Sequence, residues 1–154
     1  MPSIVANAAR VKAEEERKAL MELIEAFATE RTRRSILFIA FSGEEIGLLG
    51  SAYMAAHPPV SLEDVQAMVN MDMVGHLRSR LYLQGTGSSS VWAREIERRN
   101  VPVGLPIATK QDPYLPTDST PFYMKGAPIL SAFTGAHEDY STPRDTADKL
   151  NYEG

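Results

Sequence analysis

The chain has 154 residues, of which 44% are hydrophobic, 23% charged and 8% aromatic, so we expect one globular domain rather than a disordered or fibrous chain. A formal net charge of −4 gives no electropositive surface for nucleic acid. The longest apolar run, residues 36–41, is far shorter than the roughly 20 residues that cross a bilayer. We therefore expect no nucleic-acid partner and no membrane partner. The chain has no cysteine, so any metal site must use His, Asp or Glu.

The N-terminal part of the chain predicts a helix followed by a buried strand. Leu20, Leu23, Ile24 and Phe27 recur at helical spacing, and we expect residues 1–31 to contain one amphipathic helix, from about Asn7 to Arg31. The continuous apolar run over residues 35–41 is typical of a strand covered on both faces in a parallel sheet.

The rest of the chain alternates between helical and strand patterns. In chain order we expect a helix over 44–57, strands over 66–71 and 80–84, a turn over 85–88, helices over 91–99 and 118–125, and a strand over 128–133. Strands that alternate with helices indicate an α/β fold, here a three-layer sandwich around a mixed, largely parallel sheet. The sequence shows no repeat or linker, so we expect residues 1–154 to form a single domain.

Acidic residues and histidines follow three of the predicted strands. Glu44 and Glu45 follow the first, Asp72 ends the second, and the segment 135–140 follows the last. In open α/β sheets such positions share one rim, where ligands bind. At the start of a helix, Glu44 and Glu45 would project about 100° apart, so one can hold a metal while the other faces a bound water. The alternative is a pair of carboxylates that the helix dipole favours.

Three segments carry a family resemblance. Residues 41–51 read FSGEEIGLLGS, residues 70–75 read NMDMVG, and residues 142–154 read TPRDTADKLNYEG. In this order they resemble the double-zinc aminopeptidase family, whose wider relatives include glutamate carboxypeptidases and the metal-free ectodomain of the transferrin receptor. The likeness extends from about Ala19 to Gly154 and implies a truncated zinc-aminopeptidase-like core.

The resemblance implies a reaction and a role for three residues. In the family, two zinc ions lie beside the bound N-terminus of a peptide, and a metal-bound water attacks the scissile carbonyl. Glu44 matches the general base, Glu45 matches a ligand of one zinc, and Asp72 matches a ligand of the other.

Three of the family's five ligands have no counterpart here. Two ligands precede the Glu-Glu pair in the family, and residues 11–13 stand about where the bridging aspartate is expected. Ser141 replaces the histidine of a Tyr-His-Thr-Pro motif. We therefore expect a degenerate or engineered site with one zinc or none, and weak or no activity.

Other residues could rebuild a single-metal site. His76 and His137 are the candidate substitute ligands, together with Glu45, Asp72 or Asp139. Two other functions stay open. One is a non-catalytic binding or scaffold module on the same fold. The other is a serine hydrolase using Ser42 or Ser141, although neither lies in a Gly-x-Ser-x-Gly turn.

The expected partners are peptide N-termini, if the chain is active, and a second copy of the chain. A core that lacks some of the family's strands exposes sheet edge and apolar surface, and pairing with a second copy would cover both. We therefore expect a homodimer, formed through a sheet edge or the N-terminal helix. The sequence leaves the cellular compartment open.

Overall fold

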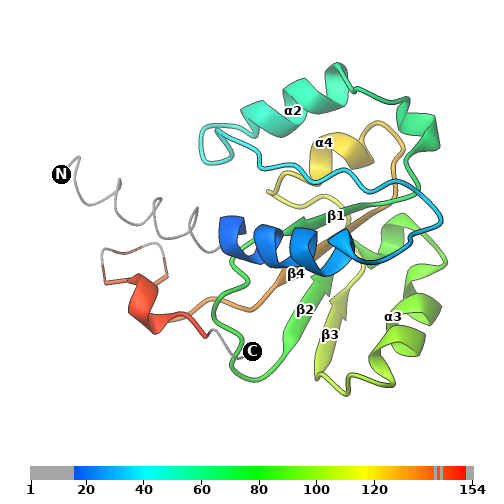
Figure 1. Ribbon diagram of the computed structural model, residues 1–154. Helices are drawn as coiled ribbons and strands as arrows, with labels where there is room; N and C mark the ends of the chain where they lie inside the picture. Colours follow the sequence, from blue (N-terminus) through cyan, green and yellow to red (C-terminus); the bar gives the residue numbers. More distant parts are fainter. Residues whose placement is uncertain (1–15, 141, 143, 152–154) are drawn as a thin grey trace. The chain divides into compact units, whose positions relative to one another are not determined.

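The computed structural model describes residues 16–140, 142 and 144–151 and contains one mixed four-stranded sheet (Figure 1). Its strands, in spatial order, are β1 (Met68–Met71), β4 (Ile129–Phe133), β2 (Leu81–Gln84) and β3 (Ile107–Lys110). β1 and β4 are parallel, β2 and β3 are parallel, and β2 and β4 are antiparallel. Two of the three pairings are therefore parallel, which confirms the predicted α/β class with a mixed, largely parallel sheet.

The chain divides into two compact units. The sheet unit consists of Phe41–Asp72 and Ser79–Phe133. The terminal unit consists of Met1–Ala40, Met73–Arg78 and Thr134–Gly154. The single domain expected over residues 1–154 stays a prediction.

The core of the sheet unit gathers around β4 and two helices, α2 (Leu49–Ala56) and α4 (Thr120–Tyr123). Ile129 of β4 is fully buried and clusters with Ala55 and Phe122, one from each helix. The rings of Phe41 and Phe122 lie 5.9 Å apart between centroids. Burial of these side chains provides the main favourable free energy for packing α2 and α4 onto the sheet.

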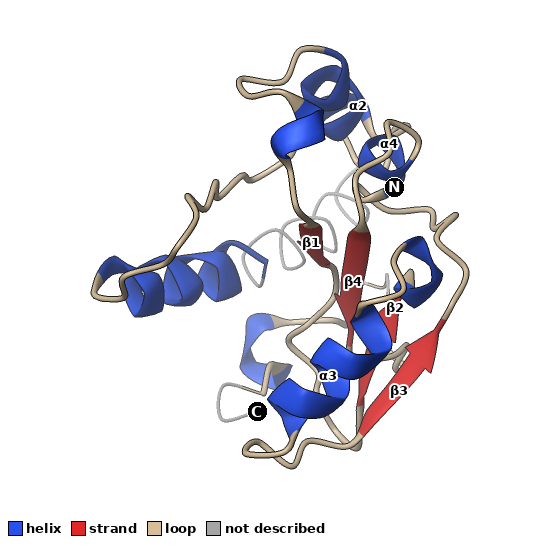
Figure 2. Cartoon of the chain, turned by 90° about the vertical axis from the view of Figure 1, so that its right-hand side faces the viewer, coloured by secondary structure: helices blue, strands red, loops and turns tan. Residues whose placement is uncertain are grey.

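The hydroxyl group of Ser88 links β4 to the helix α3 (Trp92–Asn100) in the sheet unit. Figure 2 shows both elements. Ser88, in the 3-10 helix η2 (Thr86–Ser88), donates from Oγ to the Ile129 carbonyl over 2.8 Å. The same oxygen accepts from the Ile129 backbone N–H at 3.0 Å and from Trp92 Nε1 at 3.1 Å. Ser88 thereby satisfies both backbone groups of a buried residue.

Several predicted elements are present. The strands predicted over 66–71, 80–84 and 128–133 are β1, β2 and β4, and the helix predicted over 91–99 is α3. The turn predicted over 85–88 contains η2. Residues 16–28 are helical, within the N-terminal helix predicted from about residue 7, and the rest of that prediction up to residue 15 lies outside the described residues.

The strand predicted over residues 35–41 is wrong. The structure has no strand there, and Ile36 and Leu37 are 44% and 58% exposed. An apolar run favours burial but does not by itself supply a neighbouring backbone to pair with. Conversely, β3 was not predicted, because its sequence, IATK, does not alternate between apolar and polar residues.

The two helix predictions around α2 and α4 were too long. Residues 44–47 form a turn, in which Gly47 N–H and Leu48 N–H both donate to the Glu44 carbonyl. Leu48 then has a φ of 58°, in the left-handed region, so a right-handed helix can begin only at Leu49. The helix predicted over 118–125 is limited to α4.

Within the described part of the chain, no helix is both long enough and apolar enough to cross a membrane.

We predict that Gly50→Ala destabilises the protein, although alanine favours a helix more than glycine does by about 1 kcal/mol. A Cβ at Gly50 would lie 2.7 Å from the Ser42 carbonyl oxygen, which accepts the Gly50 N–H. We expect a net loss of about 1–3 kcal/mol in the free energy of unfolding, measured in urea. Ala52→Gly, in the exposed part of the same helix, is the control and should cost about 1 kcal/mol. A stabilised Gly50→Ala variant would contradict the close approach of α2 to Ser42.

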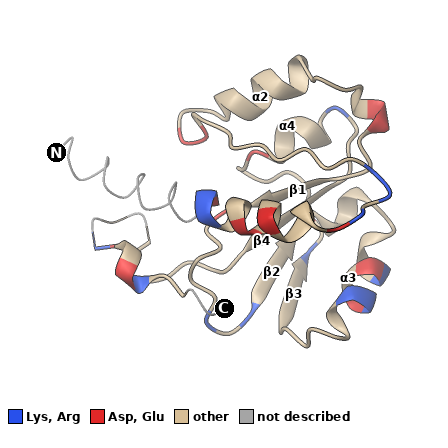
Figure 3. Cartoon of the chain, viewed as in Figure 1, with Lys and Arg blue, Asp and Glu red and all other residues tan. Residues whose placement is uncertain are grey.

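We predict a pH-dependent effect of Glu95→Gln in α3, whose charged residues are visible in Figure 3. A hydrogen bond from Arg98 Nη2, at 2.6 Å, lowers the pKa of Glu95 below its ordinary value near 4.5, with smaller contributions from Arg94 and Arg99. Because the folded pKa is depressed, the wild type should exceed the variant in stability above about pH 4.5, and the difference should vanish as the pH falls through the folded pKa.

Urea unfolding at several pH values, with and without added salt, checks this prediction. Salt should shrink the difference, since the pairs are exposed. The control, Glu97→Gln, removes a carboxylate from the same helix and leaves the Glu95 pairs in place. An advantage of wild type over Glu95→Gln that persists unchanged at low pH would contradict the assignment.

Candidate metal centre

Two histidines and an aspartate form a buried cluster in the terminal unit. His76 Nε2 lies 3.2 Å from Asp145 Oδ1, and His137 Nε2 lies 3.5 Å from Asp145 Oδ2. The two imidazole rings are stacked, with centroids 3.9 Å apart. The side chains of His76, His137 and Asp145 are 3%, 4% and 8% exposed. One ligand atom from each residue lies within 4.8 Å of the others, so the three can share one ion.

Hydrogen bonds between distant segments of the chain position the two histidines. Thr134 donates from its backbone N–H and from Oγ1 to the Met73 carbonyl, at 3.2 and 2.5 Å. His76 lies three residues after Met73, and His137 lies three residues after Thr134. The carbonyls on either side of His76, those of Gly75 and Leu77, accept from the backbone and side chain of Asn151. The His76 backbone is therefore held on both sides.

The cluster contains buried polar atoms that make no hydrogen bond within the described part of the chain. They are His76 Nε2, His137 Nε2 and Asp145 Oδ1. The nitrogens approach the carboxylate closely, but not along directions in which hydrogen bonds form. Burial, and secondly the neighbouring His76, lower the pKa of His137, which favours the neutral imidazole.

The donor set suits zinc. Zinc accepts imidazole nitrogen and carboxylate oxygen, and a tetrahedral site with bonds of about 2.0–2.1 Å separates its ligand atoms by roughly 3.3 Å. The observed separations of 3.2 and 3.5 Å agree with this spacing. The site residues therefore fit the metal that the family resemblance implies.

The structure places the predicted residues Glu44, Glu45 and Asp72 in the sheet unit. Glu44 and Glu45 lie in the turn before α2, not at the start of the helix as expected. Asp72 directly follows β1, and its backbone N–H donates to the Ala132 carbonyl of β4 over 3.1 Å. The catalytic role of Glu44 and the ligand roles of Glu45 and Asp72 stay predictions.

Asp139 lies near the cluster in sequence but has other partners. Its oxygens accept from Arg144 Nε at 2.8 Å and from Lys149 Nζ at 2.7 Å. These two hydrogen bonds, that from Lys149 first, lower the pKa of Asp139 to about 2. The ligand role predicted for Asp139 also stays a prediction, and Ser141 lies outside the described residues.

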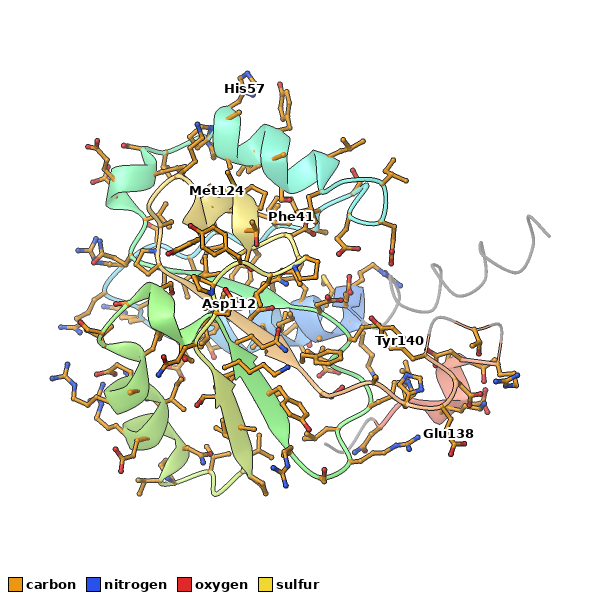
Figure 4. All side chains as sticks on the ribbon, turned by 180° about the vertical axis from the view of Figure 1, so that it is seen from behind. Phe41, His57, Asp112, Met124, Glu138 and Tyr140 are labelled. Atoms are coloured by element: carbon orange, nitrogen blue, oxygen red, sulfur yellow. The ribbon has the colours of Figure 1, made fainter. Side chains whose placement is uncertain are left out.

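Sequence reasoning missed Asp145 as a member of the cluster. The residue stands inside the segment Pro143-Arg144-Asp145-Thr146, which was used only to support the family resemblance. His137 and Asp145 both lie outside helices and strands, so no periodic pattern relates them and only folding reveals the proximity. Figure 4 shows Glu138 and Tyr140 in the loop that follows β4 and carries His137, and the Tyr140 ring lies edge-on to His137 at 6.0 Å.

Comparisons with known proteins agree with this fold. The model of Peptidase family M28 matches residues 18–154. A probable zinc metalloprotease of Pyrenophora tritici-repentis is 37% identical over 76 residues, which are 43% of this chain and 18% of that protein.

Two solved structures resemble the chain over most of its length. The zinc aminopeptidase BSAP from Bacillus subtilis superposes with a TM-score of 0.74 at 25% identity, covering 86% of this chain and 35% of that one. The Legionella LapA structure has the same TM-score, 0.74, at 21% identity, and covers 88% of this chain and 41% of that one. The chain thus spans well under half the length of these proteins.

The chain shares its α/β fold with the zinc aminopeptidase structure from Bacillus subtilis over 86% of its own length. The chain belongs to Peptidase family M28, and the predicted resemblance to double-zinc aminopeptidases is confirmed.

We predict that Thr134→Val destabilises the protein by about 1 kcal/mol, the typical net worth of one hydrogen bond. Valine keeps the shape of the buried side chain but loses the donor to the Met73 carbonyl. Urea unfolding of the metal-free protein measures the effect. Thr109→Val, on the exposed part of β3, is the control and should change stability by less than about 0.5 kcal/mol. Equal stability of Thr134→Val and wild type would contradict a structural role for this contact.

Proposed function

We propose that the chain is part of a metal-dependent aminopeptidase-like hydrolase that cleaves N-terminal peptide bonds. The observation that carries the proposal is the family match over residues 18–154, which includes Glu44, Glu45 and Asp72. The similarity to a zinc aminopeptidase structure over 86% of the chain supports it.

In this proposal Glu45 and Asp72 would hold the metal, and Glu44 would accept and then donate a proton. Bound zinc polarises the scissile carbonyl and lowers the pKa of its water. The Glu44 carboxylate takes a proton from the attacking water and delivers it to the nitrogen of the departing peptide. Glu44 is partly buried in its turn, and partial shielding from solvent favours proton transfer to a bound group over exchange with bulk water.

A second candidate function is a binding module without catalysis. The sequence favours it at one position, because Ser141 stands where the family has a ligand histidine. Serine binds zinc far less well than imidazole does, so an inherited dinuclear site that depends on this position would be weakened. A degenerate site of this kind would keep the fold and the ability to bind peptides.

We predict that Glu44→Gln lowers the hydrolysis of leucine anilide at least about 100-fold, as expected for loss of a general base. The assay uses the zinc-loaded chain and measures kcat and KM separately. The control, Glu63→Gln, changes an exposed carboxylate in the 3-10 helix η1 (Leu62–Asp64) and should leave the rate unchanged. No turnover by the wild type, together with retained binding of a peptide N-terminus, would support the binding module instead.

We also propose a homodimer formed through a sheet edge. β1 and β3 each pair with only one neighbour among the described strands, and Val69 on β1 is 62% exposed. An edge strand of this kind can extend its hydrogen bonding into a second copy.

Light scattering at micromolar concentration should give the mass of two chains, and Val69→Lys should give the mass of one, because a charge on the edge opposes pairing. A single-chain mass for the wild type would overturn the dimer.

A further inference from the structure

We propose that His76 Nε2, His137 Nε2 and the Asp145 carboxylate form a zinc site of their own in the terminal unit. This site does not depend on peptidase activity, since it uses none of Glu44, Glu45 and Asp72. The sequence suggested a single-metal site of His76 and His137 with Glu45, Asp72 or Asp139. In the proposed site Asp145 supplies the oxygen ligand instead.

The first argument is geometric. Three side chains from two distant segments bring two nitrogens to 3.2 and 3.5 Å from the two oxygens of one carboxylate. None of the three atoms His76 Nε2, His137 Nε2 and Asp145 Oδ1 makes a hydrogen bond within the described residues. One ligand atom from each of the three side chains lies within 4.8 Å of the others, which is close enough for them to share one ion.

The second argument concerns charge and burial. A carboxylate that is 8% exposed, beside two histidines that are 3% and 4% exposed, is costly to bury without a cation. A zinc ion would balance the charge of the carboxylate and bind a nitrogen of each imidazole at the same time. The alternative is one protonated histidine in an ion pair with Asp145, which the separations of 3.2 and 3.5 Å allow but which no hydrogen bond strengthens.

The position of the site indicates a structural role. The ligands come from two segments of the terminal unit that are distant along the chain, and His137 lies 61 positions after His76. Three protein ligands leave a fourth position for water, but the small exposure of the ligands restricts access of a substrate. A bound zinc would therefore join the two segments, and its binding free energy would stabilise the folded state.

The experiment titrates the metal-free 154-residue chain with Zn²⁺ in competition with a chelating dye, and with Co²⁺ as a spectroscopic probe. We expect one zinc per chain at this site and the intense visible absorption of tetrahedral Co²⁺. Asp145→Asn and His76→Gln, which keep the side-chain size, should each weaken zinc binding at least about tenfold. Zinc should also raise the unfolding temperature of the wild type more than that of the two variants.

Two controls separate this site from the inherited one. His57→Gln removes an exposed histidine at the end of α2, labelled in Figure 4, and should bind zinc as the wild type does. The double variant Glu45→Gln/Asp72→Asn should lose any peptidase activity and keep the zinc and the Co²⁺ spectrum. If it loses the metal as well, the inherited ligands hold the ion and the proposed site is wrong.

Other outcomes also decide the question. A wild type that takes up no zinc, or an octahedral Co²⁺ spectrum, would overturn the proposal, even if the ligand variants fail to fold. Unchanged zinc affinity in folded Asp145→Asn and His76→Gln would overturn it too. Failure of leucine-anilide hydrolysis with zinc still bound would count against the proposed function alone.

Discussion

The pairing of β4 with strands on both sides is the constraint on which the sheet unit depends. β4 is parallel to β1 and antiparallel to β2, so its backbone groups are used on both edges. Its residues Ile129, Leu130 and Ser131 are buried. Polar groups of the strand are hydrogen-bonded: Ser88 Oγ donates to the Ile129 carbonyl, and Asn70 Nδ2 donates to Ser131 Oγ at 3.2 Å. Because β4 pairs with β1 across about 60 residues of intervening chain, this contact forms only when the unit folds as a whole.

The terminal unit contains a cluster of buried polar side chains, formed by His76, His137 and Asp145. In this cluster two stacked imidazoles lie against a carboxylate. Backbone contacts define their positions, through Thr134 with Met73 and through Asn151 with Gly75 and Leu77. Burying these polar groups costs free energy when they lack bonding partners, and the arrangement becomes rigid when each group has one. This cost is the physical reason for regarding the cluster as a ligand site rather than as packing.

The acidic residues of the chain belong to different environments, and this limits what a family motif can decide. Glu44 and Glu45 lie in a turn that the left-handed Leu48 separates from α2, whereas Asp139 is neutralised by Arg144 and Lys149. Among the acidic residues that the structure describes, Asp145 alone combines deep burial with two imidazole neighbours. Identical residue types therefore differ in function through burial and partners, which the linear motif does not encode.

The sequence by itself determined the α/β class, the elements α3, β1, β2 and β4, and the membership in a zinc peptidase family, because these follow from local periodicity and from ordered motifs. It also selected His76 and His137 as candidate ligands, since a cysteine-free chain has few others. The start of α2, the absence of a strand over residues 35–41 and the existence of β3 depended on tertiary structure, because each is decided by a backbone neighbour or a single dihedral angle. Only the fold brought Asp145 to the histidines, since no sequence period relates residues 76, 137 and 145.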